Sequence, residues 1–344
     1  DDEKFLSSLP ADLATRVKAL LEGGRITPEL YFAIFEELHR EAREDTGHRV
    51  NVLIAPTNAH WTPDELLLQM REEATRFRTG IHIHLVETAF QKKAGLRLYG
   101  ETPLQHLDTL GFLGPDVSLA HGVWLNAKDI EVMADRGVIL CHNPSSNLRL
   151  KGGISPVAFM ARRGITVAIG TDSNSINEDE DLLMEMRLAH RLHRPPGVSS
   201  PSLTSHQVLK MATVNGAKAT MFDDVGALEK GKRADAVLVR LEGLVEPYLD
   251  PNMSIVDALV YRAKASDVDT VVIGGRPVLK GGRFVNIDEA SVVQELKKSL
   301  DRPYTRSEQE RISTAKELIP YVQRFYDSWE IGEAQPFYGY NSRT

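Results

Sequence analysis

The sequence predicts an α/β fold of the (β/α)-barrel type, followed by a small β-module and C-terminal helices. Three observations support this prediction. Short β-branched runs alternate with amphipathic segments from residue 49 onwards, each run is apolar enough to be buried on both faces, and no glycine-rich phosphate loop follows any of them. The first two favour a parallel sheet covered by helices, and the third favours a barrel over an open doubly wound sheet.

The elements follow in a regular order. Apolar residues at three-to-four spacing predict helices at 9–24 and 27–45, and no strand is evident before residue 50. Five strands are then predicted, at 49–56, 80–87, 116–122, 137–143 and 164–172. The segments between them predict helices at 63–77, 102–113, 126–136 and 153–163. These elements make five successive β/α units.

The pattern of predicted elements changes towards the C-terminus. Two more helices are predicted at 178–194 and 205–221, and glycine-rich turns between apolar runs at 234–241 and 269–285 predict antiparallel strands. Residues 288–328 return to a helical pattern. We therefore divide the chain into a barrel domain (1–225), a small β-module (226–287) and a helical extension with a tail (288–344).

Composition excludes several classes of protein. The formal net charge is -7 and the basic residues are scattered, which argues against nucleic acid or anionic lipid as a partner. No apolar run approaches the roughly 20 residues that span a bilayer, so we expect a cytoplasmic protein. The single cysteine, Cys141, excludes a disulfide framework and a Cys-rich zinc finger. A metal in this chain would need His, Asp and Glu as ligands.

Chemically reactive side chains follow four successive predicted strands. In the run IHIHLVE, His82 and His84 point to the same side of the strand, and Glu87 lies just past its end. His121, His142 and Asp172 end the next three strands. One buried histidine on a strand is usually a packed, hydrogen-bonded residue, but four such strand ends in a row predict a shared site for metal binding or proton transfer.

The motifs HLVET, LAHG, HNPSSNLRLKGG, GTDS, LKMATVNGAKAT and GALEKGKRADAVLV resemble the amidohydrolase superfamily. The most similar branch holds guanine deaminase, S-adenosylhomocysteine deaminase and the s-triazine hydrolases. The resemblance covers about residues 48–285. It implies a (β/α)8 barrel of which this chain supplies roughly strands 4 to 8, so that the domain at 1–225 lacks its first strands, and it implies that the β-module is a small β-sandwich.

The resemblance also implies the roles of the strand-end residues. A single divalent metal is expected, held by His84 and Asp172 together with an HxH pair from a segment outside this chain. Zinc is the expected metal, although such ligands also accept iron or manganese. Glu87 would act as general acid, Asp172 as the base and His121 as the group that stabilises the adduct. His82, Trp124, His142 and Asn143 are expected to bind substrate, whereas Asn147 is equally compatible with a turn role.

An alternative takes His82 and His84 as the HxH pair itself, which with His121 and Asp172 would complete a ligand set. That assignment leaves four β/α units after the pair, too few to close an eight-stranded barrel. We therefore expect the pair from an N-terminal segment of the same enzyme, present as a separate chain that covers the open strand edges.

The function that the resemblance implies is hydrolytic deamination of an amino-substituted N-heterocycle, of purine, pyrimidine, pterin or triazine type. Two alternatives stay open. One is hydrolysis of another C–N, C–Cl or C–S bond on a ring or carbamoyl carbon, and the other is a metal-free relative without catalytic activity. A homo-oligomer is also expected, with the helical tail and the aromatic segment 332–340 as a means of association.

Overall fold

The computed structural model describes residues 2–24, 26–45, 47–177, 179–195, 197 and 202–329. These residues form two compact units, one within Asp1–Glu36 and Asn286–Ala334 and the other within Glu37–Val285. The division falls inside helix α3 (Pro28–Glu44). The aromatic segment 332–340, expected to mediate association, lies outside the described residues.

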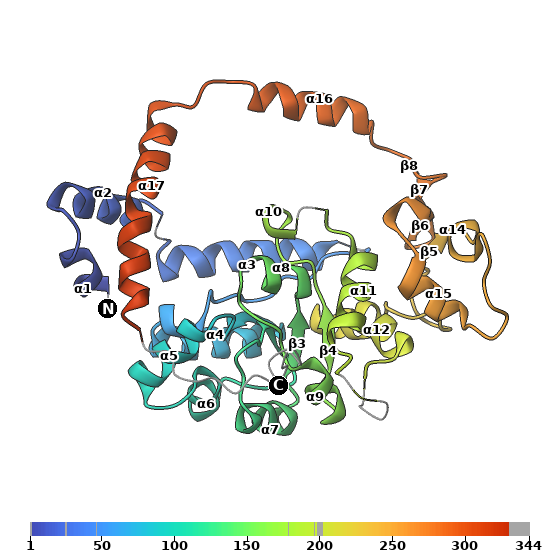
Figure 1. The fold of residues 1–344 in the computed structure, drawn as a ribbon, viewed down its shortest axis with the longest axis horizontal. Coiled ribbons are helices and arrows are strands. Elements are labelled where there is room, and N and C mark those ends of the chain that lie inside the picture. The colour runs from blue at the N-terminus through green and yellow to red at the C-terminus, as the bar shows by residue number, and fades with distance from the viewer. Residues whose placement is uncertain are drawn as a thin grey trace. The chain divides into compact units, whose positions relative to one another are not determined.

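The larger unit is built on a parallel sheet of four strands in the order β1-β2-β3-β4, of which β3 and β4 are labelled in Figure 1. The strands are β1 (Ile81–Leu85), β2 (Val117–His121), β3 (Ile139–His142) and β4 (Val167–Ile169). Leu85 pairs with His121, and His142 pairs with Ile169. The strands therefore end nearly level, so that residues after them meet at one edge. The predicted alternation of strands and helices is confirmed.

The stretch predicted as a strand at 49–56 does not form one. It runs parallel to β1 but joins it only through isolated bridges, from Ile54 to Ile81 and from Asn58 to His84. Pro56 lies between the two bridges and has no N–H to donate, which interrupts the ladder. The β-branched pattern was therefore right about the extended backbone and wrong about continuous pairing.

Helices follow the strands throughout this unit and cover the sheet, as α4, α7 and α9 do in Figure 1. Up to β4 they are η1 (Ala59–Trp61), α4 (Asp64–Phe77), α5 (Ala89–Tyr99), α6 (Pro103–Thr109), α7 (Ala127–Arg136), α8 (Pro144–Arg149) and α9 (Val157–Arg162). After it come α10 (Asn174–Asn177), α11 (Leu182–Leu192), α12 (Ser205–Ala212) and α13 (Val214–Ala219). Helices α5, α8 and α10 and the short η1 lie outside the segments predicted as helical.

Local sequence explains where the helices begin and end. Helix α7 starts at a capping box in which Asn126 accepts a hydrogen bond from the Asp129 backbone N–H, while the Asp129 carboxylate accepts one from the Asn126 N–H. The helix stops at Gly137, whose φ of 69° suits the left-handed terminating residue. The next residue leads directly into β3, which keeps the crossover short.

The two faces of strand β1 carry different side chains. Ile81, Ile83 and Leu85 are fully buried on one face, whereas His82 and His84 on the other face are only half-buried. Alternation along a strand produces this separation, because successive side chains point to opposite faces. Burial of the three apolar side chains, at roughly 1.5 to 3 kcal/mol each, fixes the register that brings the histidines to one side.

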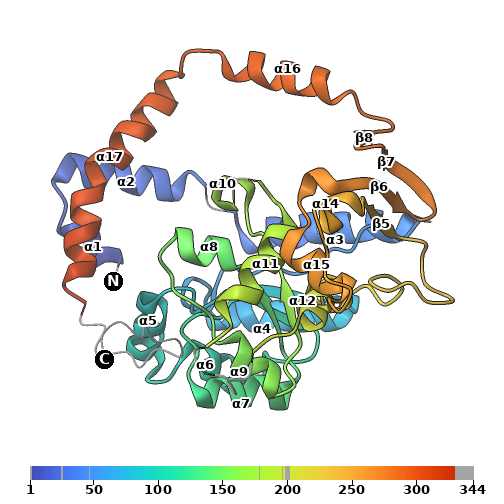
Figure 2. The ribbon, with the colours of Figure 1, turned by 45° about the vertical axis from the view of Figure 1, so that its right-hand side comes forward.

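The β-module forms the predicted antiparallel sheet, in the order β5-β6-β7-β8. Its strands are β5 (Ala236–Val239), β6 (Val268–Ile273), β7 (Arg276–Lys280) and β8 (Arg283–Phe284), with α14 (Glu242–Val245), α15 (Ile255–Arg262) and η2 (Ala265–Asp267) beside them (Figure 2). A cluster of Leu244, Ala258 and Ala263 also contacts Leu183 of α11. This packing explains why the module belongs to the same unit as the parallel sheet.

The smaller unit consists of helices α1 (Asp2–Ser7), α2 (Ala11–Glu22), the first part of α3, α16 (Glu289–Leu300) and α17 (Arg306–Asp327). Leu13 and Val17 of α2 pack against Leu318 and Tyr321. The structure thus divides the chain differently from the sequence-based boundaries, because the first 36 residues group with the C-terminal helices. None of the described helices is long and apolar enough to cross a bilayer.

Candidate active site

His84 is oriented by a backbone carbonyl beside the end of β1. Its Nδ1 lies 2.8 Å from the carbonyl oxygen of Thr57. A carbonyl can only accept, so Nδ1 carries the proton and the lone pair of Nε2 is free. A metal-binding histidine is usually held by such a hydrogen bond from its second nitrogen. His84 is therefore ready to act as a ligand through Nε2.

His121 ends β2 and is the centre of the site. Its Nδ1 lies 2.9 Å from Oδ1 of Asn147, while Nε2 lies 3.9 Å from a Glu87 carboxylate oxygen and 4.0 Å from an Asp172 carboxylate oxygen. The His84 ring stacks on the His121 ring with 5.4 Å between centroids. The structure thus brings together four of the residues that the sequence singled out.

Asp172 follows β4 in the motif GTD. One of its carboxylate oxygens accepts a hydrogen bond of 2.6 Å from the Ser146 hydroxyl. Gly170 is required two residues earlier, because a Cβ at this position would lie 2.6 Å from the Asn143 side-chain oxygen. The backbone of this turn therefore packs directly on Asn143, the N-cap residue of α8.

Three residues at or just after strand ends adopt left-handed backbone conformations that are unfavourable for residues other than glycine. They are Val86, His121 and Asp172, with φ values of 42°, 72° and 67°. Such conformations cost of order 1 to 3 kcal/mol each and concentrate at functional sites, where surrounding contacts maintain them. Here they turn the chain sharply, and the last two belong to the cluster itself.

His82 points to the same face as His84 but makes different contacts. Its Nδ1 lies 2.7 Å from the Ser118 hydroxyl oxygen, and that hydroxyl in turn donates to the Ile81 carbonyl. Burial, with smaller contributions from His84 and His121, lowers the pKa of His82 to about 4. The side chain is therefore neutral at pH 7. It lies on the same face of β1 as His84, beside the cluster of His84, Glu87, His121 and Asp172.

His142 lies on the opposite face of the sheet. Its Nε2 is 3.1 Å from Nε2 of His193, which follows α11, and both residues are buried. Burial, and then the neighbouring His193, lowers the pKa of His142 well below its usual value. The structure therefore places His142 in a buried histidine pair and not in contact with the four clustered residues. Sequence reasoning gave no role to His193.

Trp124 and Asn143 are held by local contacts. The Trp124 indole N–H donates to the Gly152 carbonyl at 2.7 Å, and a Cβ on Gly152 would lie 2.7 Å from the Glu87 carbonyl oxygen. Trp124 thus anchors the loop that packs on Glu87. Asn143 is buried at the start of α8. Ser146, which bonds Asp172 directly, was missed by the sequence analysis.

The donors at this edge suit a metal but do not complete a site. One imidazole nitrogen with a free lone pair and one carboxylate match the ligands that zinc accepts. Among the described residues, no group of three or more His, Cys, Asp or Glu side chains is arranged to hold a metal ion. A structural zinc site needs four ligands and a catalytic one usually three, so further donors would have to join His84 and Asp172.

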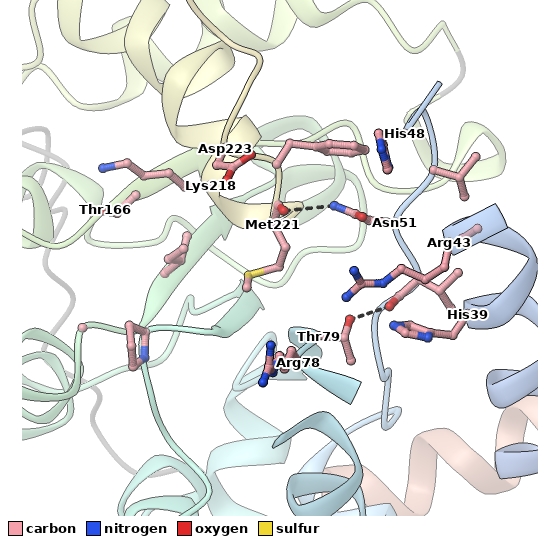
Figure 3. Close-up of a pocket in the computed structure, with 17 residues that line it drawn as sticks. His39, Arg43, His48, Asn51, Arg78, Thr79, Thr166, Lys218, Met221 and Asp223 are labelled. Atoms are coloured by element: carbon pink, nitrogen blue, oxygen red, sulfur yellow. Dashed lines mark hydrogen bonds between the residues drawn. The ribbon is translucent and has the colours of Figure 1, made fainter. Parts of the chain in front are cut away.

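A cavity of about 660 Å³ opens at the other end of the same strands (Figure 3). Its lining includes residues that precede each strand: Arg78, Thr79, Pro115, Gly137 and Thr166. None of the clustered His, Glu and Asp residues lines it. Parallel barrels assemble their active sites where the strands end. The cluster around His121, at the ends of the strands, is therefore a better candidate for the active site than this cavity at their starts.

The chain is similar to proteins of one known family over most of its length. The sequence profile described as the amidohydrolase family matches residues 6–278. The chain is 38% identical over 258 residues to 5′-deoxyadenosine deaminase of Methanosarcina barkeri, covering 75% of this chain and 59% of that protein. It is 35% identical over 264 residues to 5-methylthioadenosine/S-adenosylhomocysteine deaminase of Caldanaerobacter subterraneus, covering 76% and 60%. The chain thus spans about three fifths of the length of these relatives.

Two solved structures are similar to this chain in fold. An adenosine deaminase from Xanthomonas campestris with bound zinc aligns with a TM-score of 0.75 and 32% identity, over 80% of this chain and 62% of that one. Atrazine chlorohydrolase from Arthrobacter aurescens complexed with zinc aligns with a TM-score of 0.73 and 26% identity, over 79% and 60%. The predicted barrel class is confirmed by these likenesses together with the parallel sheet.

Proposed function

Because this chain belongs to the amidohydrolase family, we propose that it carries the catalytic strand ends of a metal-dependent deaminase acting on an aminated heterocycle. The relatives from Methanosarcina barkeri, Caldanaerobacter subterraneus and Xanthomonas campestris are named as deaminases of adenine nucleosides, which supports an aminopurine nucleoside as the substrate. The observation that carries the proposal is the position of His121, with Nε2 within 4.0 Å of both the Glu87 and Asp172 carboxylates.

The proposed roles follow from charge and geometry. A divalent metal, for which we propose zinc held by His84 and Asp172, would lower the pKa of its water to about 7 and make hydroxide available. Asp172 accepts the proton of the attacking water. Glu87 donates a proton to the ring nitrogen beside the attacked carbon and later to the leaving amine. His121, with protons on both ring nitrogens, donates a hydrogen bond from Nε2 to the oxygen that forms on that carbon, while its Nδ1 donates to Asn147.

The overall reaction is C–NH2 plus water giving C=O plus ammonia. The attacking water supplies the oxygen. One of its two protons, taken up by Asp172, leaves with the amine as ammonia, and the other replaces the proton that Glu87 gave to the ring nitrogen, which stays on the product. His82, which is neutral at pH 7, lines the wall beside the ring. We propose that Trp124 and Asn143 support this wall through the loop at Gly152 and through the start of α8, respectively. His142 stays a predicted substrate residue whose pairing with His193 gives no support to that role.

The remaining metal ligands form part of the proposal. Two donors from this chain leave a zinc site incomplete, and the relatives extend well beyond the matched region. We propose that an HxH pair from an N-terminal segment of the same enzyme, outside these 344 residues, completes it. Intact mass of the purified active enzyme tests this, since a single 38.3 kDa species with stoichiometric zinc and full activity would reject it.

The experiment for the activity is an ammonia-release assay on the zinc-loaded enzyme. The panel contains 5′-deoxyadenosine, 5-methylthioadenosine, S-adenosylhomocysteine, adenosine and guanine, with atrazine as the test for chloride release. Ammonia from an aminopurine supports the proposal, and the preferred substrate refines it. Chloride release without ammonia would favour the alternative of C–Cl hydrolysis, which the likeness to atrazine chlorohydrolase keeps open. No turnover and no bound zinc would favour a non-catalytic relative.

A further inference from the structure

Resting on the proposed function, we infer that Glu185 is a positioning residue for the active site. It would act through α8, a short helix whose side chains hold two members of the catalytic cluster. Ser146 donates to Asp172 at 2.6 Å, and Asn147 accepts from His121 at 2.9 Å. One helix therefore sets the orientation of both the proposed base and the proposed hydrogen-bond donor. What holds α8 in place then matters for the chemistry.

Glu185 lies on α11 and is completely buried. One carboxylate oxygen accepts the backbone N–H of Ser145 at 3.1 Å, and the other accepts the Asn177 side-chain amide at 2.7 Å. The same Asn177 amide lies 2.6 Å from the Ser145 hydroxyl. The carboxylate thus fixes the first turn of α8, one residue before Ser146.

A buried carboxylate is expensive unless its oxygens are hydrogen-bonded, so this contact is not incidental packing. Burial raises the pKa of Glu185, while the bonds from Ser145 and Asn177 act in the opposite direction. Each carboxylate oxygen faces an N–H donor, which a carboxylate matches and an amide cannot. In Glu185→Gln the new NH2 group must face one of those donors, so one bond is lost and α8 is free to shift.

The experiment compares E185Q with D129N in the zinc-loaded active enzyme. Asp129 is also a buried carboxylate, and it accepts hydrogen bonds from Thr102, Gln105 and Asn126, at the starts of α6 and α7 and not on α8. Both variants should lose thermal stability. Only E185Q should lower kcat, by about 10-fold with KM within about twofold, and weaken zinc binding by about 10-fold in a chelator competition, the scale typical for groups that orient metal ligands.

A second variant keeps the test decisive if E185Q folds poorly. S146A removes only the hydroxyl that bonds Asp172 and should also weaken zinc binding by about 10-fold. If Glu185 acts through Ser146, the double variant should lose clearly less than the product of the two single losses. Unchanged zinc affinity in E185Q or S146A, or equal losses of activity in E185Q and D129N, would overturn the inference. An inactive wild-type enzyme would reject the proposed function, while the zinc-affinity comparison would still decide the role of Glu185.

Discussion

The two ends of the parallel sheet differ in the features that an active site needs. At the ends of the strands, the cluster around His121 is compact, and hydrogen bonds from α8 orient two of its members. At their starts, a cavity of about 660 Å³ has exposed basic side chains in its lining, including Arg43, Arg78 and Lys218. An open cavity lies at one end, and prearranged reactive groups lie at the other. Preorganisation and not cavity size is what catalysis requires.

The hydrogen bonds around the cavity at the strand starts hold the backbone in place. Asn51 donates to the backbone carbonyl of Met221 at 3.0 Å, and Thr79 donates to the Val52 carbonyl at 2.5 Å (Figure 3). These bonds tie the extended segment before Pro56 to the start of β1 and to the end of α13. They close the wall of the cavity without bringing acid and base side chains together.

The largest effect is expected from Asp172→Asn. This change removes a proposed metal ligand and the proposed base together, so kcat/KM should fall by more than about 10³-fold, with loss of bound zinc. Ammonia release and zinc content measure the two effects. Asp223→Asn in the basic cavity is the matched control and should leave both unchanged. Equal losses in the two variants would remove the distinction between the two ends of the sheet.

Glu87→Gln should have the next largest effect. An amide cannot deliver a proton, so kcat should fall by about 10² to 10⁴-fold, the range typical of a general acid. Zinc content should stay at the wild-type value, because Glu87 is not a proposed ligand. Steady-state kinetics with metal analysis would check this. An active E87Q enzyme would mean that the proton comes from another group.

The histidine pair behind the sheet predicts a pH effect on stability. Burial lowers the pKa of His193 to about 4, against 6.5 for the unperturbed side chain. The unfolded state therefore binds the proton more readily, and stability present above pH 6.5 is lost as the pH falls towards 4. This histidine should account for about 2 kcal/mol of the fall in unfolding free energy between pH 7 and pH 5.

The measurement is denaturant unfolding of wild type and His193→Gln at both pH values. The variant should be less stable at pH 7 but should lose about 2 kcal/mol less on acidification. A pH dependence identical to that of wild type would show that His193 is accessible to protons in the folded state.

The smallest effect is expected at the basic cavity. Arg78→Ala and Lys218→Ala change exposed side chains, so unfolding free energies should stay within about 0.5 kcal/mol of wild type. Turnover should change by less than a factor of two. A loss of activity comparable to that of E87Q would make the cavity part of the functional site.

The sequence identified the central cluster because its signal is local. Strand periodicity places His84 near the end of β1, and Glu87 follows within the same motif, while His121 ends β2 and Asp172 follows β4. Parallel strands bring their ends to one edge, so four local patterns suffice to predict one site. The extended backbone at 49–56 was also predictable, although Pro56 reduced the strand to isolated bridges.

The supporting residues could not be found in this way, because their partners are distant in sequence. Ser146 bonds a residue 26 positions away, and Glu185 bonds the backbone of a residue 40 positions away. Nothing in the pattern around Glu185 distinguishes it from an ordinary charged helix residue. His193 likewise becomes meaningful only through its contact with His142. Helices α1 and α2 group with α17 through tertiary packing that no local pattern encodes.

The most direct test of the central claim is anomalous diffraction at the zinc edge from crystals of the active enzyme. Our account predicts a peak about 2.0 to 2.2 Å from His84 Nε2 and from a carboxylate oxygen of Asp172, with Glu87 beside it but not bound. A zinc ion bound elsewhere, for example by His142 and His193, with none between His84 and Asp172, would contradict it.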